Sequence, residues 1–430
     1  MRFKFKIIYY WLRILSLPRF DSREVIERYQ AKKLKKFAGN VLSKSTYYKR
    51  FIHNGKFDLS AIPLISKTEF MSSFNEINTK EILLDEALNV AIEAENSRNF
   101  KSEINGTTIG LSTGTSGKRG VFLVSENERA MWVALVMSRV IKPKIFKRQK
   151  IAFFLRANSN LYSSVESSLF EFKYFDIFKP MSELLQELNK YQPDILASQP
   201  SILIDIAEAQ KKQIIYIQPI QIISFAEVLH ESDKIELKKV FDSKLSEVYQ
   251  CTEGFLGATC EYGTMHLNED FIYFEKEWID KELFYPIITD FSRQSQPVVK
   301  YKLNDILKIK KDDCLCGSKF IALEKIIGRE DDILIFSGKK IYPDLISRRI
   351  ALKTDVFTKY TITQTGPMKL EIRIECNQTV YDSLKIDFQA VLHTLFEEFG
   401  VSNVKYDFHN SVDYSTGNKL RKIKRLNYGN

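Results

Sequence analysis

Residues 193–212 read PDILASQPSILIDIAEAQKK and contain a strand-like run followed by a helix-like run. The run from Asp194 to Ala197 follows a proline and is predicted to be a strand, and Ile202 to Lys212 is predicted to be a helix. The alternation continues with a predicted strand over Ile220–Phe225, a helix over Glu231–Phe241 and a strand over Ser246–Tyr249. Such alternation is typical of an α/β domain with a largely parallel sheet, whose ligands bind beyond the carboxyl ends of the strands.

The pattern extends in both directions from this stretch. Ser125 is predicted to cap a helix, with Glu128 three residues later completing a capping box. The first hundred residues look helical, and strand-like segments of mixed polarity follow Gly254. We place a domain boundary near Gly328, before a compact unit of roughly a hundred residues. The predicted fold class is therefore α/β, with a large N-terminal domain (1–327) of mostly parallel sheets and a small α+β C-terminal domain (328–430).

The composition is that of a soluble globular protein. Of the 430 residues, 44% are hydrophobic and 27% are charged, and the five cysteines are too few for a disulfide framework. No apolar run reaches the ~18 residues that a membrane span needs, and no signal-peptide cleavage site follows the apolar N-terminal stretch. We therefore expect a cytoplasmic protein.

The net charge of +10 favours anionic partners such as nucleotides, nucleic acid or lipid headgroups. The first twenty residues mix aromatic side chains with basic ones and contain no acid: Arg2, Lys4, Lys6, Arg13 and Arg19. This stretch could make weak peripheral contact with a membrane, but we favour a packed first helix. A basic nucleic-acid-binding protein is the alternative from another functional class. The basic clusters are scattered and no recognition motif is present, so we expect no nucleic-acid partner.

A glycine-rich loop is the sharpest motif. It reads STGTSGKRG over residues 112–120 and holds three of the chain's 17 glycines. Backbone N–H groups of such a loop can point together at phosphate oxygens, and its hydroxyls and cations add donors. It is not a Walker loop, because Ser112 stands at the first glycine and Arg119 follows the lysine. The alternative interpretation is a flexible hairpin turn.

Three further segments have the residue types of a nucleotide site. Glu253, beside Thr252 at the end of a predicted strand, can hold Mg²⁺ together with phosphate oxygens. Asp305 leaves another predicted strand and could accept both hydroxyls of a ribose. The charged segment 328–332, followed by Tyr342-Pro343, could serve as a hinge. Each of these segments, taken alone, could also be an ordinary turn.

Taken in order, these segments resemble the successive core motifs of the AMP-forming adenylating enzyme superfamily. They are most similar to the phenylacetate–CoA ligase group, including its relatives in capsule and surface-polysaccharide gene clusters. The resemblance spans about residues 110–425 and includes Gln199-Pro200-Ser201, Ser224-Phe225-Ala226-Glu227 and the tail Ser415–Arg421. The chain departs from the group's usual residues at Arg119, Gln250, Lys302 and Asn418. Because Gln250 stands where glycine is usual, beside the adenine and acyl pocket, it leaves the acyl specificity open.

The resemblance implies an AMP-forming carboxylate ligase that uses ATP and Mg²⁺. It implies catalytic roles for Lys419, Glu253 and Thr252, with Glu253 positioning the magnesium and Lys419 reaching the substrate from a mobile C-terminal lid. The implied nucleotide-binding residues are Ser112, Thr113, Gly114, Thr115, Ser116, Gly117, Lys118, Ala226, Glu227, Tyr249, Gln250, Asp305 and Arg329. The aromatic segment 162–178 is expected to shape the acyl pocket or to form the core face of a helix.

The acceptor of the activated acyl group is left open. The leading interpretation is transfer of a small carboxylic acid to the thiol of CoA. The alternative is an enzyme of surface-polysaccharide biosynthesis that passes the acyl or aminoacyl group to a sugar or an amine. A degenerate, purely structural member of the family is a further alternative.

Two cysteine- or histidine-containing pairs predict a structural zinc site. Cys260 and His266 lie just past the Thr-Glu motif, and Cys314 and Cys316 lie between Asp305 and the hinge segment. Four such ligands suit tetrahedral Zn²⁺ and leave no open position for catalysis. Some members of the phenylacetate–CoA ligase group look similar here, with a Cys-x-Cys-Gly segment before the hinge. The alternative is that the cysteines are small buried hydrophobic residues.

Overall fold

The computed structural model describes residues 2–53, 56–97, 102–111, 120–141, 147–155, 165–167, 169–354, 357, 359–412 and 421–426. The chain divides into two compact units. The first comprises Met1–Leu303 and Ile309–Lys325, and the second comprises Asn304–Lys308 and Ile326–Asn430.

A parallel sheet lies at the centre of the first unit. Its strands are β7 (Phe170–Asp176), β6 (Gln149–Leu155), β8 (Ile195–Ser198), β9 (Gln221–Phe225) and β10 (Lys244–Cys251), in that spatial order. Beyond β10 the sheet becomes antiparallel, through β11 (Gly254–Thr259), β12 (Met265–Leu267) and the first residues of β17 (Ala322–Arg329). The predicted α/β class is thus confirmed, with a sheet that is mixed beyond β10.

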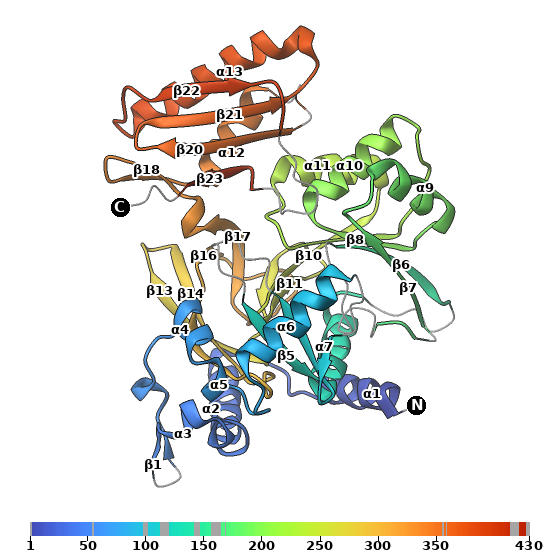
Figure 1. The fold of residues 1–430 in the computed structure, drawn as a ribbon, viewed down its shortest axis with the longest axis vertical. Coiled ribbons are helices and arrows are strands. Elements are labelled where there is room, and N and C mark those ends of the chain that lie inside the picture. The colour runs from blue at the N-terminus through green and yellow to red at the C-terminus, as the bar shows by residue number, and fades with distance from the viewer. Residues whose placement is uncertain are drawn as a thin grey trace. The chain divides into compact units, whose positions relative to one another are not determined.

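Helices cover both faces of the parallel part (Figure 1). On one side lie α9 (Met181–Tyr191), α10 (Pro200–Lys211) and α11 (Glu231–Phe241), and on the other lies α7 (Glu126–Arg139). Successive strand residues alternate between the two cores: Leu196 packs with α9–α11, whereas Ile195 and Ala197 pack in the cluster that contains α7. Because both of its faces are buried, the central strand β8 appears in the sequence as a nearly continuous apolar run.

The sequence predicted the helix at Ser125 correctly. The Ser125 side chain accepts a hydrogen bond from the Glu128 backbone N–H, and the Glu128 carboxylate accepts one from Ser125, as a capping box requires. The aromatic segment was predicted less well. The interpretation of 162–178 as a helix core is wrong for Phe170–Asp176, which form β7 and pair with β6 residue by residue. Aromatic residues such as the Phe and Tyr of this segment are favoured in strands.

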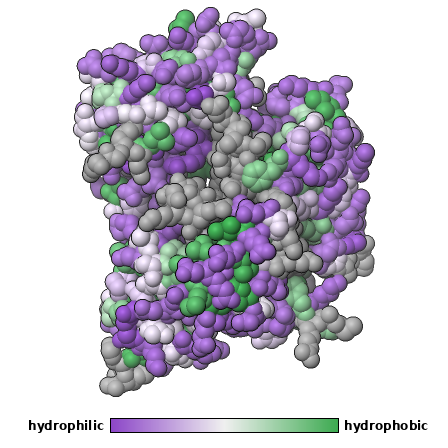
Figure 2. All heavy atoms as spheres, viewed as in Figure 1, coloured by the Kyte–Doolittle hydropathy of each residue, from purple (hydrophilic) through white to green (hydrophobic). Residues whose placement is uncertain are grey.

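The first hundred residues are mainly helical, as expected. Their helices are α1 (Arg2–Leu15), α2 (Arg23–Asn40), α3 (Thr46–Lys49), α4 (Lys67–Ser72), α5 (Phe74–Ile77) and α6 (Leu84–Asn96), with short strands β1 (Ile52–His53) and β2 (Lys56–Phe57). Apolar side chains gather over α6 on the face shown in Figure 2, where the rest of the surface is mostly hydrophilic. Within the described ranges, no helix is long and apolar enough to cross a membrane.

Two further groups of strands complete the first unit. A three-stranded antiparallel sheet contains β3 (Glu103–Ile104), β4 (Thr107–Leu111) and β5 (Val121–Ser125). The glycine-rich loop lies between β4 and β5. The other group is antiparallel and contains β13 (Ile272–Trp278), β14 (Leu283–Asp290) and β15 (Val298–Lys302).

The second unit is an α+β fold, as the sequence indicates. Its sheet has the order β22 (Lys405–His409), β21 (Lys369–Glu375), β20 (Lys359–Gly366) and β23 (Ile423–Arg425). The helices are α12 (Pro343–Lys353) and α13 (Gln378–Glu398), and β18 (Leu334–Phe336) pairs with β19 (Lys339–Ile341). One apolar core joins these elements, centred on Phe336, Phe388 and Phe396. The chain passes between the two units at three points: between Leu303 and Asn304, within β16 (Asp305–Ile309) and within β17.

Candidate functional site

The carboxyl ends of β8, β9 and β10 lie side by side. The three strands are parallel, and Ser198 is paired with Ser224 in the register of β8 and β9. Just past β9, the Glu227 carboxylate accepts a hydrogen bond of 3.2 Å from the Ser201 backbone N–H at the start of α10. Ala226 has a φ of 71°, which is unusual for a residue with a side chain. Residues 199–201 and 224–227, which carry the family resemblance, therefore form one contiguous edge.

The predicted magnesium ligand lies in a tight turn. Thr252 and Glu253 connect β10 to β11, and Cys251 pairs with Gly254 across the turn. The Tyr301 hydroxyl donates a hydrogen bond of 2.8 Å to the Glu253 carboxylate. Tyr301 is itself buried, so it holds this carboxylate in one orientation at the end of β10.

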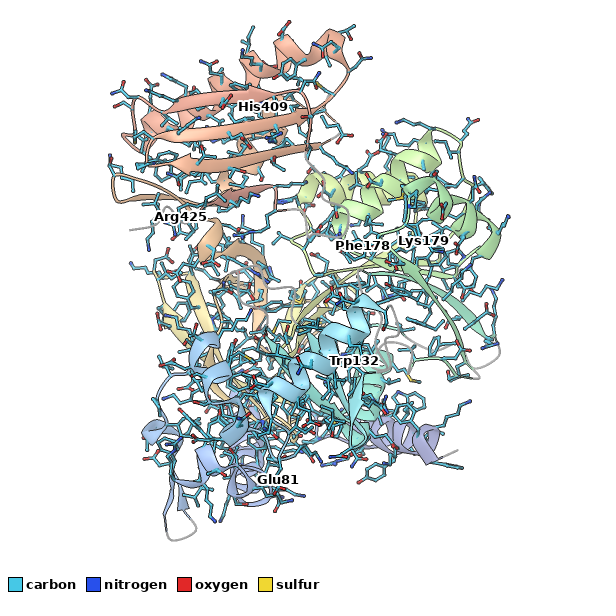
Figure 3. All side chains as sticks on the ribbon, in the orientation of Figure 1. Glu81, Trp132, Phe178, Lys179, His409 and Arg425 are labelled. Carbon is cyan, nitrogen blue, oxygen red and sulfur yellow. The ribbon has the colours of Figure 1, made fainter. Side chains whose placement is uncertain are left out.

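Gln250 has an aromatic partner that the sequence did not predict. The Trp132 indole N–H, from α7, donates to the Gln250 amide oxygen at 3.2 Å. Trp132 is labelled in Figure 3. The register of β10 against β11 shifts between Tyr249 and Gln250, which marks a bulge at this point. Tyr249 is buried, whereas Gln250 is half-buried. Bulges re-aim side chains at the ends of strands, and here the bulge directs Gln250 towards α7.

The second unit brings the predicted ribose and hinge residues together. Asp305 is buried, and its carboxylate oxygen lies 3.5 Å from the Arg329 guanidinium Nε. The Glu330 backbone N–H donates to the Asn304 carbonyl at 2.8 Å, which ties the start of β16 to the segment after β17. Asp305 and Arg329, predicted from separate motifs, are thus neighbours.

Asp332 anchors the C-terminal tail to the same segment. The Arg421 guanidinium Nε donates to the Asp332 carboxylate at 2.5 Å. Burial raises the pKa of Asp332, while the positive charge of Arg421 acts in the opposite direction. Lys419, two residues before Arg421, lies outside the described residues. So do Ser112, Thr113, Gly114, Thr115, Ser116, Gly117 and Lys118.

A second carboxylate lies behind the Glu253 turn. Asp290 ends β14, and its Oδ2 would lie only 2.7 Å from a Cβ placed on Gly254, so only glycine fits there. Burial raises the pKa of Asp290 to about 6, even though the Ser292 hydroxyl and backbone N–H donate to it. A buried carboxyl with a raised pKa close to a predicted metal ligand belongs to the candidate site. The local sequence Thr-Asp-Phe gives no sign of it.

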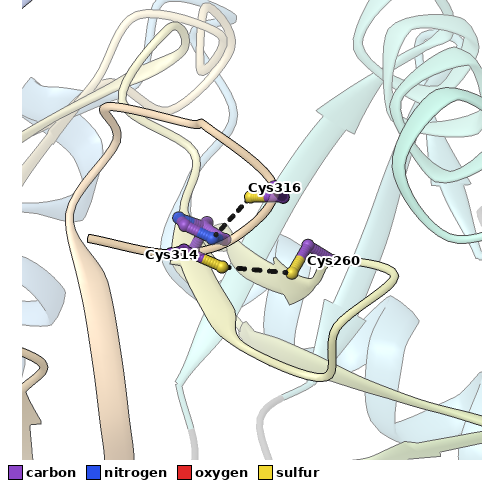
Figure 4. Close-up of side chains that lie close together, drawn as sticks. Cys260, Cys314 and Cys316 are labelled. Atoms are coloured by element: carbon purple, nitrogen blue, oxygen red, sulfur yellow. Dashed lines mark hydrogen bonds between the residues drawn. The ribbon is translucent and has the colours of Figure 1, made fainter. Parts of the chain in front are cut away.

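The four predicted zinc ligands form one cluster in the first unit (Figure 4). The Sγ atoms of Cys260 and Cys314 are 3.7 Å apart, and the Cys316 Sγ is 3.3 Å from the His266 Nε2. All four ligand atoms lie within 4.8 Å of one another. The other ring nitrogen of His266 lies 3.3 Å from the Phe320 carbonyl oxygen, which orients Nε2 towards the cysteines. The donor set and its spacing fit a tetrahedral metal ion.

Two curated proteins are similar to the chain in sequence. Protein CapK of Staphylococcus aureus is 24% identical over 55% of this chain and 54% of its own length. Phenylacetate-coenzyme A ligase of Thermus thermophilus is 21% identical over 45% of this chain and 48% of its own length. The chain thus spans about half the length of the curated relatives that it matches. No protein-family model matches it.

Solved structures resemble the chain over a longer span. The structure of 2-hydroxyisobutyryl-CoA ligase in complex with 2-hydroxyisobutyryl-AMP covers 96% of this chain and 94% of its own, with a TM-score of 0.70 and 18% identity. The chain has the fold of the AMP-forming CoA ligases. An amide bond synthetase from Marinactinospora thermotolerans shares this fold more distantly, with a TM-score of 0.52 over 76% of this chain and 69% of its own, at 10% identity. Together with the sequence similarity to phenylacetate-coenzyme A ligase and CapK, this shared fold confirms the resemblance to the phenylacetate–CoA ligase group.

Proposed function

We propose that this protein activates a small carboxylic acid with ATP and then transfers the acyl group to CoA. The carboxylate would attack the α-phosphorus, releasing pyrophosphate and leaving an acyl-adenylate. The thiol would then attack the acyl carbon and release AMP. The observation that carries the proposal is the sheet edge where Ala226-Glu227 follow β9, while Gln250 and Thr252-Glu253 lie at the end of the adjoining strand β10. In α/β folds, this is where ligands bind.

The charges of the site suit this chemistry. A carboxylate and a triphosphate repel each other, so the reaction needs positive charge at the point of attack. When bound, Mg²⁺ would neutralise phosphate charge, and Glu253, held by Tyr301, is the residue that we assign to it. Asp305 would accept the ribose hydroxyls. The tail that Arg421 ties to Asp332 would carry Lys419. We propose that residues 328–430 act as the mobile lid of the family, with Ser112–Lys118 cradling the phosphates.

CoA is the favoured acceptor because a structure of 2-hydroxyisobutyryl-CoA ligase holds both the acyl-adenylate and CoA. Transfer to an amine or a sugar is the second candidate. It is favoured by the amide bond synthetase, whose fold this chain shares. Both acceptors would use the same adenylate, so the site described above is compatible with either one.

We further propose that Cys260, His266, Cys314 and Cys316 bind a structural zinc ion. Tetrahedral Zn–S bonds of about 2.3 Å place two sulfurs about 3.8 Å apart, close to the 3.7 Å between Cys260 and Cys314. Four protein ligands leave no open position, so the role of the ion would be to stabilise the fold.

A pyrophosphate-exchange assay across a panel of carboxylic acids tests the proposed function. We expect acid-dependent exchange without any acceptor, and CoA-thioester formation when CoA is added. Exchange without thioester formation would favour an amine or a sugar as acceptor. If no acid supported exchange in a protein that binds ATP, the adenylation function would be refuted.

A further inference from the structure

Helix α1 packs against the protein by one face. Ile7 is buried in the core cluster with α7, and Phe3, Tyr10, Trp11 and Ile14 pack against the same cluster. Lys6 forms an ion pair of 3.0 Å with Glu126, and the Arg129 guanidinium lies over the Phe3 ring at 5.4 Å. Figure 1 shows α1 beside α7. These contacts agree with the expectation that the first helix packs against the rest of the protein.

The opposite face of α1 is also apolar, and it is exposed. Five large side chains at helical spacing are between 50% and 64% exposed: Phe5, Ile8, Tyr9, Leu12 and Leu15. These residues lie at positions i, i+3, i+4, i+7 and i+10, so they form one continuous stripe along the helix. We call them the outer stripe. A contiguous exposed apolar stripe on a well-packed helix marks an interaction surface.

The charges beside the outer stripe indicate what binds it. Lys4 and Arg13 are exposed, and at 100° per residue they lie on opposite flanks of the stripe. The first turn of α1 contains no acid, and the first acidic residue of the chain is Asp21. An apolar stripe with one cation on each flank complements an anionic lipid surface, in which the apolar side chains meet the acyl chains and the cations meet the phosphates. A helix of 14 residues spans ~21 Å, too short to cross a bilayer but long enough to lie in its plane.

We propose that α1 is a peripheral membrane anchor that inserts its outer stripe into an anionic phospholipid surface. The inner face keeps its contacts with α7, so the folded enzyme is held at the membrane without unfolding. The cations attract the helix to the surface, and the outer stripe then holds it there. This proposal does not depend on the proposed function, since none of these residues belongs to the candidate site.

Sedimentation with sucrose-loaded vesicles tests the anchor. We expect the wild-type protein to pellet with vesicles of phosphatidylcholine and phosphatidylglycerol in equal parts, and far less with phosphatidylcholine alone. The double variant Ile8→Glu/Leu12→Glu removes two apolar contacts and adds two repelled charges, and should weaken binding by about a hundredfold or more. Lys4→Gln/Arg13→Gln should weaken binding to the anionic vesicles by about tenfold and leave the weak binding to neutral vesicles unchanged.

A matched control separates the outer stripe from general surface hydrophobicity. Ile214→Glu/Ile235→Glu makes the same chemical change at positions that are 60% and 62% exposed elsewhere in the first unit, and should bind vesicles as the wild type does. Equal thermal unfolding midpoints would show that all variants are folded. The proposal is refuted if the wild type does not pellet with anionic vesicles or if Ile8→Glu/Leu12→Glu binds them equally well. A stable wild-type dimer that this variant dissociates in sedimentation velocity would also overturn it, since a second copy would then cover the outer stripe.

Discussion

Replacing Cys316 by serine tests the proposed zinc site through both metal content and stability. Cys316 lies 3.3 Å from His266 Nε2, and a tetrahedral site with Zn–S and Zn–N bonds of about 2.3 and 2.05 Å requires about 3.6 Å, so a small adjustment would accommodate the ion. Serine cannot supply a thiolate. If free zinc exceeds the dissociation constant a thousandfold, losing the ion costs about 4 kcal/mol of stability. At about 2 °C per kcal/mol for a large domain, we expect the unfolding midpoint to fall by about 8 °C.

The assay combines elemental analysis with thermal unfolding of protein purified without chelator. We expect about one equivalent of zinc in the wild type and about half or less in Cys316→Ser. Cys376→Ser is the matched control, because Cys376 lies in the second unit, where its thiol contacts Asn410 instead of the cluster. It should keep its zinc and its unfolding midpoint. A wild-type protein with little zinc, or an unchanged midpoint in Cys316→Ser, would show that the four side chains are only packed together.

The other predictions concern the candidate site. Lys419→Ala should abolish adenylate formation and leave ATP binding nearly intact in a titration, whereas Lys422→Ala should be nearly neutral; the opposite ranking would refute the role of Lys419. Asp305→Ala should weaken ATP binding by ~2–5 kcal/mol, and unchanged affinity would exclude a ribose contact. Gln250→Gly should lower the KM of bulkier acids relative to small ones in the exchange assay, and an unchanged ranking would place Gln250 away from the acyl group. Because the pKa of Asp290 rises from 3.8 to about 6 on folding, the folded state binds its proton more tightly and loses stability as the pH rises between these values. Asp290→Asn should therefore be more stable than the wild type above pH 6 but not below pH 3.8, and a gain independent of pH would contradict this reasoning.

The parallel sheet could be predicted from the sequence because its strands are buried on both faces. Runs such as Ile195–Ala197 and Gln221–Phe225 have no polar alternation, and each is followed by a helix with one apolar face. The strand β7 was not predicted, because its aromatic residues alternate with charged ones. Those aromatic residues were interpreted as part of the acyl pocket or as the core face of a helix. Aromatic residues suit strands, helices and pockets alike, so composition could not decide between them.

Only part of the candidate site could be predicted from the sequence, because residues that contact each other there lie far apart in the chain. Motifs placed Gln250 and Glu253 at the end of a strand, where the structure has them, whereas Asp305, predicted to leave a strand, is the first residue of β16. Their partners lie far away in the chain: Trp132 is 118 residues from Gln250, and Tyr301 is 48 residues from Glu253. No local pattern contains such pairs. The cluster of Cys260, His266, Cys314 and Cys316 was the exception, because cysteine and histidine are so few in this chain that two close pairs of them are conspicuous.

Three departures from regular structure lie where β9, β10 and β11 meet. Ala226 has a positive φ without being glycine or asparagine and without capping a helix, a conformation that costs about 1–3 kcal/mol. The bulge between Tyr249 and Gln250 interrupts the register one residue before Cys251, and Gly254 leaves no room for a side chain against Asp290. Strain of this kind persists where the surrounding structure imposes it, and it clusters at active sites. These features support the proposal that this edge is the functional site, independently of any related protein.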